Sequence, residues 1–334
     1  MMSLRPIVVD ADNMVLGGNM RLKALQHLKF KQIPDEWVKN AADLTEDEQR
    51  RFIIADNVSG GEWDVEDLSA NWDRQELEDW GLEIEWPVIE PEAIEDDYEI
   101  PDTIETDIVL GDLFEIGDHR LLCGDSTDSD SVARLMNGEK ADLGLTDPPY
   151  NLGYDYATYD DNLTSNEYCD FIIGYVSNLI LFSAKQIITS GKQNVGYYYK
   201  NFDITEFAVW YAKNKMSGSK ISNLGLCEPI LFIGKFDRNA RPTDLFEYNV
   251  KQQENTGGHT CPKVLEFFAD LIKSYCKTTV LDLFLGSGTT MVASHQLNRK
   301  CYGMELDPKY CQVIIDRMRK LDPTLIIKRN GELI

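Results

Sequence analysis

The sequence predicts an α/β fold with a mostly parallel sheet, preceded by a small α+β domain. From residue 108 onward, short apolar runs typical of strands alternate with longer runs of helical periodicity, which favours parallel strands connected by helices. A glycine-rich turn, "LGSGTT", separates one such strand from the helix that follows it. The chain has 334 residues and is 43% hydrophobic, which is sufficient for two domains with packed cores.

Residues 1–85 carry the signals of the small domain. The run "RPIVVDADNMVLGGNMRLKALQHL" predicts a strand, a turn, a second short strand and then a helix that begins near Gly18. Thr45 and Glu48 have the spacing of a capping box, so a helix is expected to begin there. A further helix is expected over "DRQELEDWGL", with Gly81 as its C-terminal stop.

Acidic residues are concentrated before the α/β region. Residues 86–107 are acidic, contain three prolines and show no regular periodicity, so we expect a linker extended by charge repulsion. The net charge is −24, but residues 35–130 carry 32 acidic and 5 basic side chains, whereas the remainder carries 25 acidic and 28 basic ones. This distribution argues against broad contacts between the N-terminal segment and a polyanion, and it does not exclude such contacts elsewhere.

The α/β region, residues 108–330, has the following predicted elements in chain order. "LFEIGDHRLLCGD" predicts two short strands, "ADLGLT" a third, and "NEYCDFIIGYVSNLILFSAK" a helix. "FAVWYAK" and "EPILFIGK" predict strands, and "PKVLEFFADLIKSYC" an amphipathic helix. The run from Thr278 to Met318 then predicts a strand, the glycine-rich turn, a helix, a second strand, a turn and a last helix.

Cysteine content and hydropathy indicate the cellular compartment in which the chain is expected. No apolar run approaches the roughly 18 residues of a membrane helix, and the N-terminus lacks the apolar core of a signal peptide, so no membrane partner is expected. The seven cysteines are scattered and form no CxxC pair. We therefore expect reduced thiols, a cytoplasmic location and no metal site.

The glycine-rich turn indicates a nucleoside-containing cofactor. Gly286 and Gly288 permit a tight turn, and Glu305 ends the next strand, where a carboxylate can accept hydrogen bonds from ribose hydroxyls. Met291 stands where a dinucleotide motif has its third glycine, and no phosphate-binding P-loop is present. S-adenosylmethionine, which has a ribose and an adenine but no phosphate, fits this pattern. A plain structural turn is the alternative.

The sequence "TDPPY" is a stiff loop with a carboxylate at one end and an aromatic ring at the other. Asp147 and the carbonyl of Pro148 could accept the two hydrogens of an exocyclic amine, a poor nucleophile, and so direct its lone pair. Tyr150 could stack on a base rotated out of a duplex, while Pro148 and Pro149 keep the array rigid. An ordinary tight turn is the alternative.

Residues 108–328 resemble the permuted group of S-adenosylmethionine-dependent DNA amino-methyltransferases, in which the DPPY loop precedes the FxGxG turn. The matching blocks, in order, are "HRLLCGD", "DLGLTDPPYNLGY", "ITSGKQN", "CEPILFIGK", "GHTCPK", "LDLFLGSGTT" and "GMELDPKYC". The resemblance implies a doubly wound, mostly parallel sheet of the Rossmann-like methyltransferase type. The blocks depart from the family pattern at Leu283 and Val264, where proline is usual.

The resemblance also implies roles for individual residues. Its catalytic loop would consist of Asp147, Pro148, Pro149 and Tyr150. Its cofactor-binding residues would be Asp125, Asp282, Phe284, Gly286, Gly288, Thr289, Glu305, His259 and Lys263.

By the same resemblance, the chain would transfer the methyl group of S-adenosylmethionine to N6 of a flipped adenine in double-stranded DNA, in a bacterial or phage-infected cell. Alternatives are cytosine N4, an RNA base or a protein glutamine as acceptor, and a non-catalytic DNA-binding protein with a decayed domain. No Pro-Cys pair is present, which disfavours methylation of cytosine C5. A homodimer and a paired restriction nuclease are the further partners considered.

Two other regions have predicted roles. The segment containing "GGNMRLKA" resembles a truncated ParB-like N-terminal domain, in which Arg21 is the residue of interest, with docking or target selection as its expected role. DNA specificity is expected from residues 151–258, where Arg238 and Arg241 could reach bases or phosphates, with an ordinary surface loop as the alternative.

Overall fold

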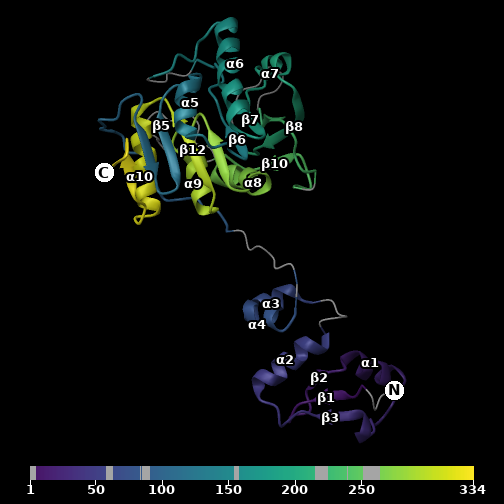
Figure 1. The fold of residues 1–334 in the computed structure, drawn as a ribbon. Helices are drawn as coiled ribbons and strands as arrows, with labels where there is room; N and C mark the ends of the chain where they lie inside the picture. Colours follow the sequence, from purple (N-terminus) through teal and green to yellow (C-terminus); the bar gives the residue numbers. More distant parts are fainter. Residues whose placement is uncertain are drawn as a thin grey trace. The chain divides into compact units, whose positions relative to one another are not determined.

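The computed structural model describes residues 5–57, 63–82, 84, 91–153, 158–214, 225–238, 240–250 and 264–334. The chain divides into two compact units, Met1–Ile89 and Glu90–Ile334, which are described separately (Figure 1). No helix in the described ranges is both long enough and apolar enough to cross a membrane.

The first unit combines a small sheet with short helices. Its strands β1 (Ile7–Val9), β2 (Val15–Gly17) and β3 (Val38–Asn40) lie in the order β2-β1-β3, with β2 antiparallel and β3 parallel to β1. Its helices are α1 (Asn19–His27), a 3₁₀ turn (Asp35–Trp37), α2 (Glu46–Asn57), α3 (Val65–Asn71) and α4 (Arg74–Asp79).

Helix starts and stops in the first unit follow the local signals. Helix α1 begins directly after Gly18, whose φ of 90° is left-handed. The side chain of Glu48 accepts the backbone N–H of Thr45 at 2.8 Å, which forms the predicted capping box of α2. Gly81 follows α4 with a φ of 88°. The sequence pattern did not predict β3 or α3.

The second unit is built on one large sheet. Its strands are, across the sheet, β10 (Leu245–Glu247), β8 (Ile204–Tyr211), β9 (Cys227–Ile233), β7 (Gln186–Thr189), β6 (Leu143–Thr146), β11 (Thr279–Asp282), β12 (Lys300–Glu305), β5 (His119–Cys123), β4 (Leu113–Ile116), β13 (Ile327–Arg329) and β14 (Glu332–Leu333). Its helices are α5 (Ser129–Met136), α6 (Ser165–Phe182), α7 (Val195–Asn201), α8 (Leu265–Tyr275), α9 (Thr289–Gln296) and α10 (Pro308–Leu321).

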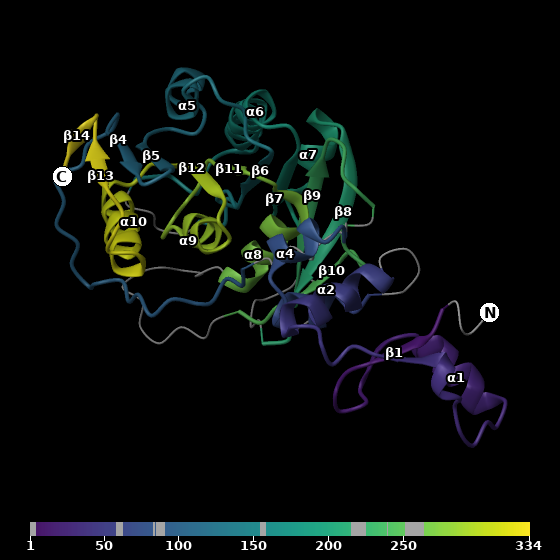
Figure 2. The ribbon, with the colours of Figure 1, turned by 60° about the horizontal axis from the view of Figure 1, so that its bottom comes forward.

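Helices cover both faces of this sheet. Helices α5 and α6 lie on one face, and α8, α9 and α10 on the other (Figure 2). Each layer has its own buried cluster, one formed largely by α5, α6 and α7 and the other by α8, α9 and α10. The predicted helices and strands of this unit are confirmed at α6, α8, α9, α10, β4, β5, β6, β8, β9, β11 and β12.

The sheet is mixed, and the expectation of a mostly parallel sheet is correct only for its centre. Strands β7, β6, β11, β12 and β5 are parallel neighbours. Strand β9 runs antiparallel to both β7 and β8, and β4, β13 and β14 add antiparallel pairings at the other side. The parallel centre places the carboxyl ends of β5, β6, β11 and β12 at one edge, where open α/β sheets bind ligands.

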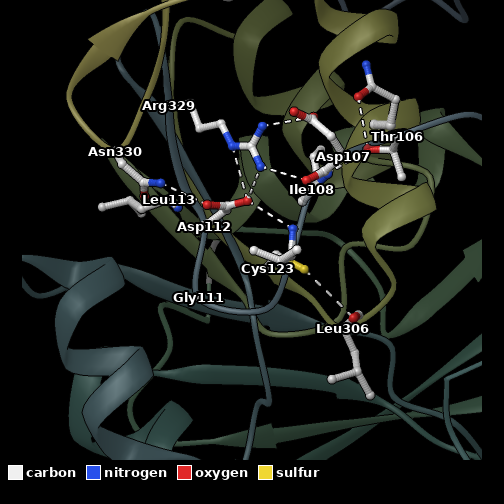
Figure 3. A network of polar contacts seen from close by, with 12 residues as sticks. Thr106, Asp107, Ile108, Gly111, Asp112, Leu113, Cys123, Leu306, Arg329 and Asn330 are labelled. Carbon is white, nitrogen blue, oxygen red and sulfur yellow. Dashed lines mark hydrogen bonds and ion pairs between the residues drawn. The ribbon is translucent and has the colours of Figure 1, made fainter.

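Residues 91–107, which we call the strap, contain no helix or strand and lie along the second unit. The backbone of Ile94 exchanges two hydrogen bonds with the side chain of Gln296, at 2.6 and 2.9 Å. Asp96 binds the guanidinium of Arg317. Asp107 binds that of Arg329 at 2.8 Å (Figure 3). The linker expected over residues 86–107 stays a prediction in its first residues, which lie outside the described ranges, whereas the strap belongs to the second unit and is held there by ion pairs with arginines.

Candidate active site

The loop Asp147–Tyr150 directly follows β6 at the carboxyl edge of the sheet. All four residues of β6 are buried. Gly144 lets helix α6 approach this strand closely, because a Cβ atom at this position would lie 2.7 Å from the side chain of Leu179. The predicted catalytic loop is therefore anchored in the core on its N-terminal side.

Two buried side chains fix the backbone of this loop. The Tyr168 hydroxyl donates to the Pro149 carbonyl at 2.9 Å, and the Asn194 amide donates to the Tyr150 carbonyl at 2.8 Å. The same amide donates to the Tyr168 hydroxyl at 2.9 Å, so the two supports are joined. Within the described ranges, no donor occupies the carbonyl of Pro148. That carbonyl is the loop acceptor that a ligand could use.

The Asp147 carboxylate lies among three other polar side chains. Its Oδ1 atom accepts hydrogen bonds from the hydroxyls of Thr189 and Tyr150, the latter at 2.7 Å. The Tyr150 hydroxyl also lies 3.3 Å from Oε2 of Glu228. Burial and the neighbouring Asp147 raise the pKa of Tyr150 well above its usual value, so its phenol is a proton donor at neutral pH. The predicted stacking of Tyr150 on a base stays a prediction.

The glycine-rich turn follows β11 and has the conformation that its glycines permit. Gly286 and Gly288 have φ values of 54° and 89°, and Gly288 precedes the first residue of α9. In β12, Gly303 makes room for the turn, because a Cβ atom there would lie 2.0 Å from the Leu285 side chain. A Cβ atom at Gly286 would meet no heavy atom within 4 Å. The turn therefore has open space above it.

Glu305 lies at the end of β12, beside this turn. Its two carboxylate oxygens accept the backbone N–H groups of Gly286 at 2.8 Å and Asp307 at 2.9 Å. Burial raises the pKa of Glu305 to about 7, although these hydrogen bonds oppose the shift. Each carboxylate oxygen has a second acceptor position, so the side chain can also bind a pair of hydroxyls.

Asp282 connects the glycine-rich turn to the predicted catalytic loop through buried hydrogen bonds. It is 2% exposed and accepts hydrogen bonds from Thr146 at 2.7 Å, Thr290 at 2.6 Å and the Phe284 N–H at 3.0 Å. Burial raises its pKa to about 6. Because Thr146 precedes Asp147, these bonds fix the distance between the two motifs. The role of Asp282 seen here is to hold the turn, with its oxygens directed into the protein.

The remaining predicted cofactor residues lie in different settings. Asp125 is exposed after β5, where Gly124 donates its N–H to the Glu305 carbonyl at 2.9 Å, so it is near the same edge. Phe284 packs edge-on against Phe171 and Tyr175. Thr289 is the first residue of α9. His259 and Lys263 lie outside the described residues.

The arginines selected from the sequence also differ in setting. Arg241 pairs with Asp270 and lies over the ring of Phe246, 4.0 Å from its centroid, so it is committed to packing and the expected contact with DNA is not supported. Arg238 is exposed. In the first unit, Arg21 donates to the Pro6 carbonyl at 3.1 Å.

Four residues of the site were not selected from the sequence. Thr189 and Glu228 contact Asp147 and Tyr150. Asp161, which is 2% exposed, accepts the N–H groups of the two residues after Tyr150, both at 2.9 Å. Arg317 donates to the Ser287 carbonyl of the turn at 3.0 Å. Glu228 and Thr189 lie in the matching blocks "CEPILFIGK" and "ITSGKQN", the one signal that could have identified them.

The fold and the site define an α/β protein in which a rigid carboxylate loop and a nucleoside-type turn meet at one sheet edge. Residues 141–316, more than half of the chain, match the model of the N6/N4 methyltransferase family of DNA methylases. The chain belongs to this family and is a DNA methyltransferase.

Individual relatives share parts of the chain. The type II methyltransferase M.HpaI of Haemophilus parainfluenzae is 26% identical over 238 residues, which cover 60% of this chain and 74% of the relative. The PvuII DNA methyltransferase, specific for cytosine N4, is a similar solved structure with 17% identity and a TM-score of 0.47, covering 63% and 90% of the two chains. The M1.HpyAVI–SAM complex has 23% identity and a TM-score of 0.43, covering 59% and 98%.

Proposed function

We propose that this chain methylates N6 of adenine in double-stranded DNA, with S-adenosylmethionine as methyl donor. The observation that carries the proposal is the position of Asp147, the first residue of an Asp-Pro-Pro-Tyr loop, beside the glycine-rich turn. Thr146 and Asp282 tie the two together through a buried hydrogen bond of 2.7 Å. In the DNA amino-methyltransferases that the chain resembles, an aspartate at this loop position favours adenine over cytosine as the target base.

The residues of the turn fit the cofactor. The open space above Gly286 can accept a ligand without a steric clash, and Glu305 can accept hydrogen bonds from both ribose hydroxyls. Asp125 lies near the same edge and is exposed, where it can bind the adenine end. When bound, S-adenosylmethionine supplies a methyl group on a positively charged sulfur.

The loop acts on the acceptor amine. Asp147 accepts one N–H of the exocyclic amine and the Pro148 carbonyl, to which no described residue donates, accepts the other, which turns the nitrogen lone pair toward the turn. The negative charge of Asp147 also stabilises the positive charge that develops on this nitrogen. The supports from Tyr168 and Asn194 keep both acceptors in position while the base binds.

Cofactor affinity should depend on pH through Glu305. Its pKa is raised to about 7, so the carboxylate becomes protonated as the pH falls below 7 and loses acceptor capacity for the ribose. We expect the affinity for S-adenosylmethionine to fall by about tenfold between pH 8 and pH 6, measured by calorimetry. Glu305→Gln should bind more weakly and without this dependence. Glu266→Gln, an exposed glutamate, should behave as the parent, and a parental affinity that is constant over this range would contradict the assignment.

Nucleoside mass spectrometry tests the function directly. The chain is expressed in a host that lacks adenine methylation, and the DNA is compared with that from cells expressing Asp147→Ala. N6-methyladenine with the parent and none with the variant is the expected result. N4-methylcytosine would reassign the target base, and no modified base from a folded protein that binds the cofactor would overturn DNA as the substrate.

The first unit is part of the same proposal. We infer that it is an accessory domain of ParB-like type that acts in docking or target selection. The block "GGNMRLKA" carries the resemblance, and in the structure its left-handed Gly18 directly precedes the helix that carries Arg21.

A further inference from the structure

The backbone that follows Tyr150 is bound to a second segment of the chain. The two carboxylate oxygens of Asp161 accept the N–H groups of Asn151 and Leu152, both at 2.9 Å. The backbone carbonyl of Asp161 accepts the N–H of Gly153 at 2.8 Å. One residue, which is only 2% exposed, therefore binds the N–H groups of all three residues after the predicted catalytic loop.

The side chain of Asn151 binds the same segment in return. Its Oδ1 atom accepts the Leu163 N–H at 2.8 Å, and its Nδ2 atom donates to the Leu163 carbonyl at 2.9 Å. Asn151 has a φ of 55°, a left-handed conformation that asparagine adopts more readily than most residues. These two hydrogen bonds and the three from Asp161 join residues 151–153 to residues 161–163, and we call them the clamp.

The second segment is itself fixed to the core. Leu163 packs against the buried cluster formed largely by α5, α6 and α7. Thr164 directly follows it and caps the N-terminus of α6. Tyr168 of the same helix donates to the Pro149 carbonyl at 2.9 Å. The clamp and the start of α6 therefore bind the catalytic loop immediately after and before Tyr150.

We propose that Asp161 is a positioning residue for methyl transfer, which fixes the end of the catalytic loop so that Asp147 and the Pro148 carbonyl keep one geometry toward the acceptor amine. The inference rests on the catalytic role proposed above for this loop. Asp161 touches neither substrate nor cofactor in this role and acts through the backbone of Asn151 and Leu152.

Two physical properties make this position effective. Hydrogen bonds to an ionised carboxylate are roughly twice as strong as bonds between neutral groups, so Asp161 is a stronger anchor than an amide or hydroxyl would be. The two prolines of the loop restrict its backbone, so that a displacement at its end moves the loop as a whole. A misplacement of about 1 Å at a reacting group can cost about 10²-fold in rate.

Asp161→Ala tests this assignment, with Asp160→Ala as its matched control. Methyl transfer from radiolabelled S-adenosylmethionine to unmethylated plasmid DNA is measured in steady state and in single turnover. Each rate is divided by the concentration of cofactor-binding sites found by calorimetry, so that unfolded protein does not contribute. Asp161→Ala should lower kcat and the single-turnover rate by roughly 10- to 100-fold, with KM for DNA and for the cofactor within about threefold of the parent.

The control and the conservative variant bracket this effect. Asp160 is exposed, and its carboxylate accepts the N–H of Asn162 at 3.0 Å, so Asp160→Ala should keep the parental kcat. Asp161→Asn keeps one of the two acceptor oxygens and should have a rate between those of Asp161→Ala and the parent.

Asn151→Gly tests the clamp from its other end. Glycine adopts the left-handed conformation without strain, so this change removes only the two hydrogen bonds to Leu163. It should lower kcat by about tenfold, and the double variant with Asp161→Ala should lose less than the product of the two single effects, because both act on the same segment. If Asp161→Ala does not fold, Asn151→Gly decides the test.

The outcomes distinguish this inference from the proposed function. A parental kcat with a raised KM for DNA would assign Asp161 to DNA binding and overturn its positioning role. A loss that disappears when rates are divided by cofactor-binding sites would assign it to folding alone, and an equal loss from Asp160→Ala would also overturn the proposal. All three leave DNA methylation intact. A parent protein that binds the cofactor but methylates no DNA would overturn the proposed function itself.

Discussion

Asp147→Asn is expected to lower the rate of methyl transfer by about 10³-fold. Asparagine has nearly the same shape, so the loop and its supports from Tyr168 and Asn194 should persist. It has no negative charge to stabilise the nitrogen that becomes positive during transfer. Its amide oxygen can still accept the hydroxyls of Thr189 and Tyr150, which both donate to Oδ1, so the NH₂ group would replace Oδ2 and remove an acceptor for the amine.

Single-turnover assays on unmethylated DNA measure this effect on the chemical step. The affinity for S-adenosylmethionine should change by less than about twofold, because Asp147 belongs to the loop that we propose binds the base rather than the cofactor. Asp170→Asn, an exposed aspartate on α6, is the matched control and should retain the parental rate. A rate for Asp147→Asn within tenfold of the parent would show that the carboxylate charge is not needed for the reaction.

Arg317→Met is expected to destabilise the second unit by roughly 3 kcal/mol. The Arg317 guanidinium forms two hydrogen bonds with Asp96, at 2.6 and 2.7 Å, and both side chains are less than 10% exposed. It also donates to the Ser287 carbonyl at 3.0 Å. Without the arginine, the Asp96 carboxylate would be buried without its cation, so the strap should detach around residues 94–98 and the glycine-rich turn should lose a support.

Urea unfolding and hydrogen exchange can follow both consequences. Amide protection should fall in the strap and in the turn, and affinity for the cofactor should fall with it. Arg319→Met is the matched control, because Arg319 is exposed on the same helix. The double variant Arg317→Met with Asp96→Leu should recover much of the lost stability, since it leaves no unpaired charge. Equal destabilisation by the single and double variants would place the effect elsewhere than in the Asp96–Arg317 pair.

The sequence predicts the elements whose signals are local. The capping box at Thr45 and the left-handed glycines at 286 and 288 act within a few residues, and the structure has them. The mixed character of the sheet was not predictable in this way. Whether β9 runs parallel or antiparallel to β7 depends on which strands become neighbours, and β7 itself has only four residues, all buried.

The candidate site shows the same division. The DPPY loop and the glycine-rich turn are contiguous motifs, so their residues could be selected from the sequence. Thr189 and Glu228 reach Asp147 only through the arrangement of β7 and β9, which no local pattern specifies. The position of the strap could not be predicted from local sequence either. Its acidic side chains would repel one another in isolation, but in the structure they bind Arg317 and Arg329, which lie more than 200 positions later in the sequence.

The strap determines where the chain can be cut to separate the methyltransferase unit from the first unit. Composition alone suggests that the module begins after residue 107, at the end of the acidic segment. A fragment cut there would lose Asp96, the carboxylate partner of Arg317, and Asp107, one of the two carboxylate partners of Arg329, which would keep Asp112. A fragment that begins at Glu90 keeps them. Exchange of the N-terminal unit between related enzymes, in the laboratory or by recombination, would therefore preserve a folded recipient only when the junction lies before the strap.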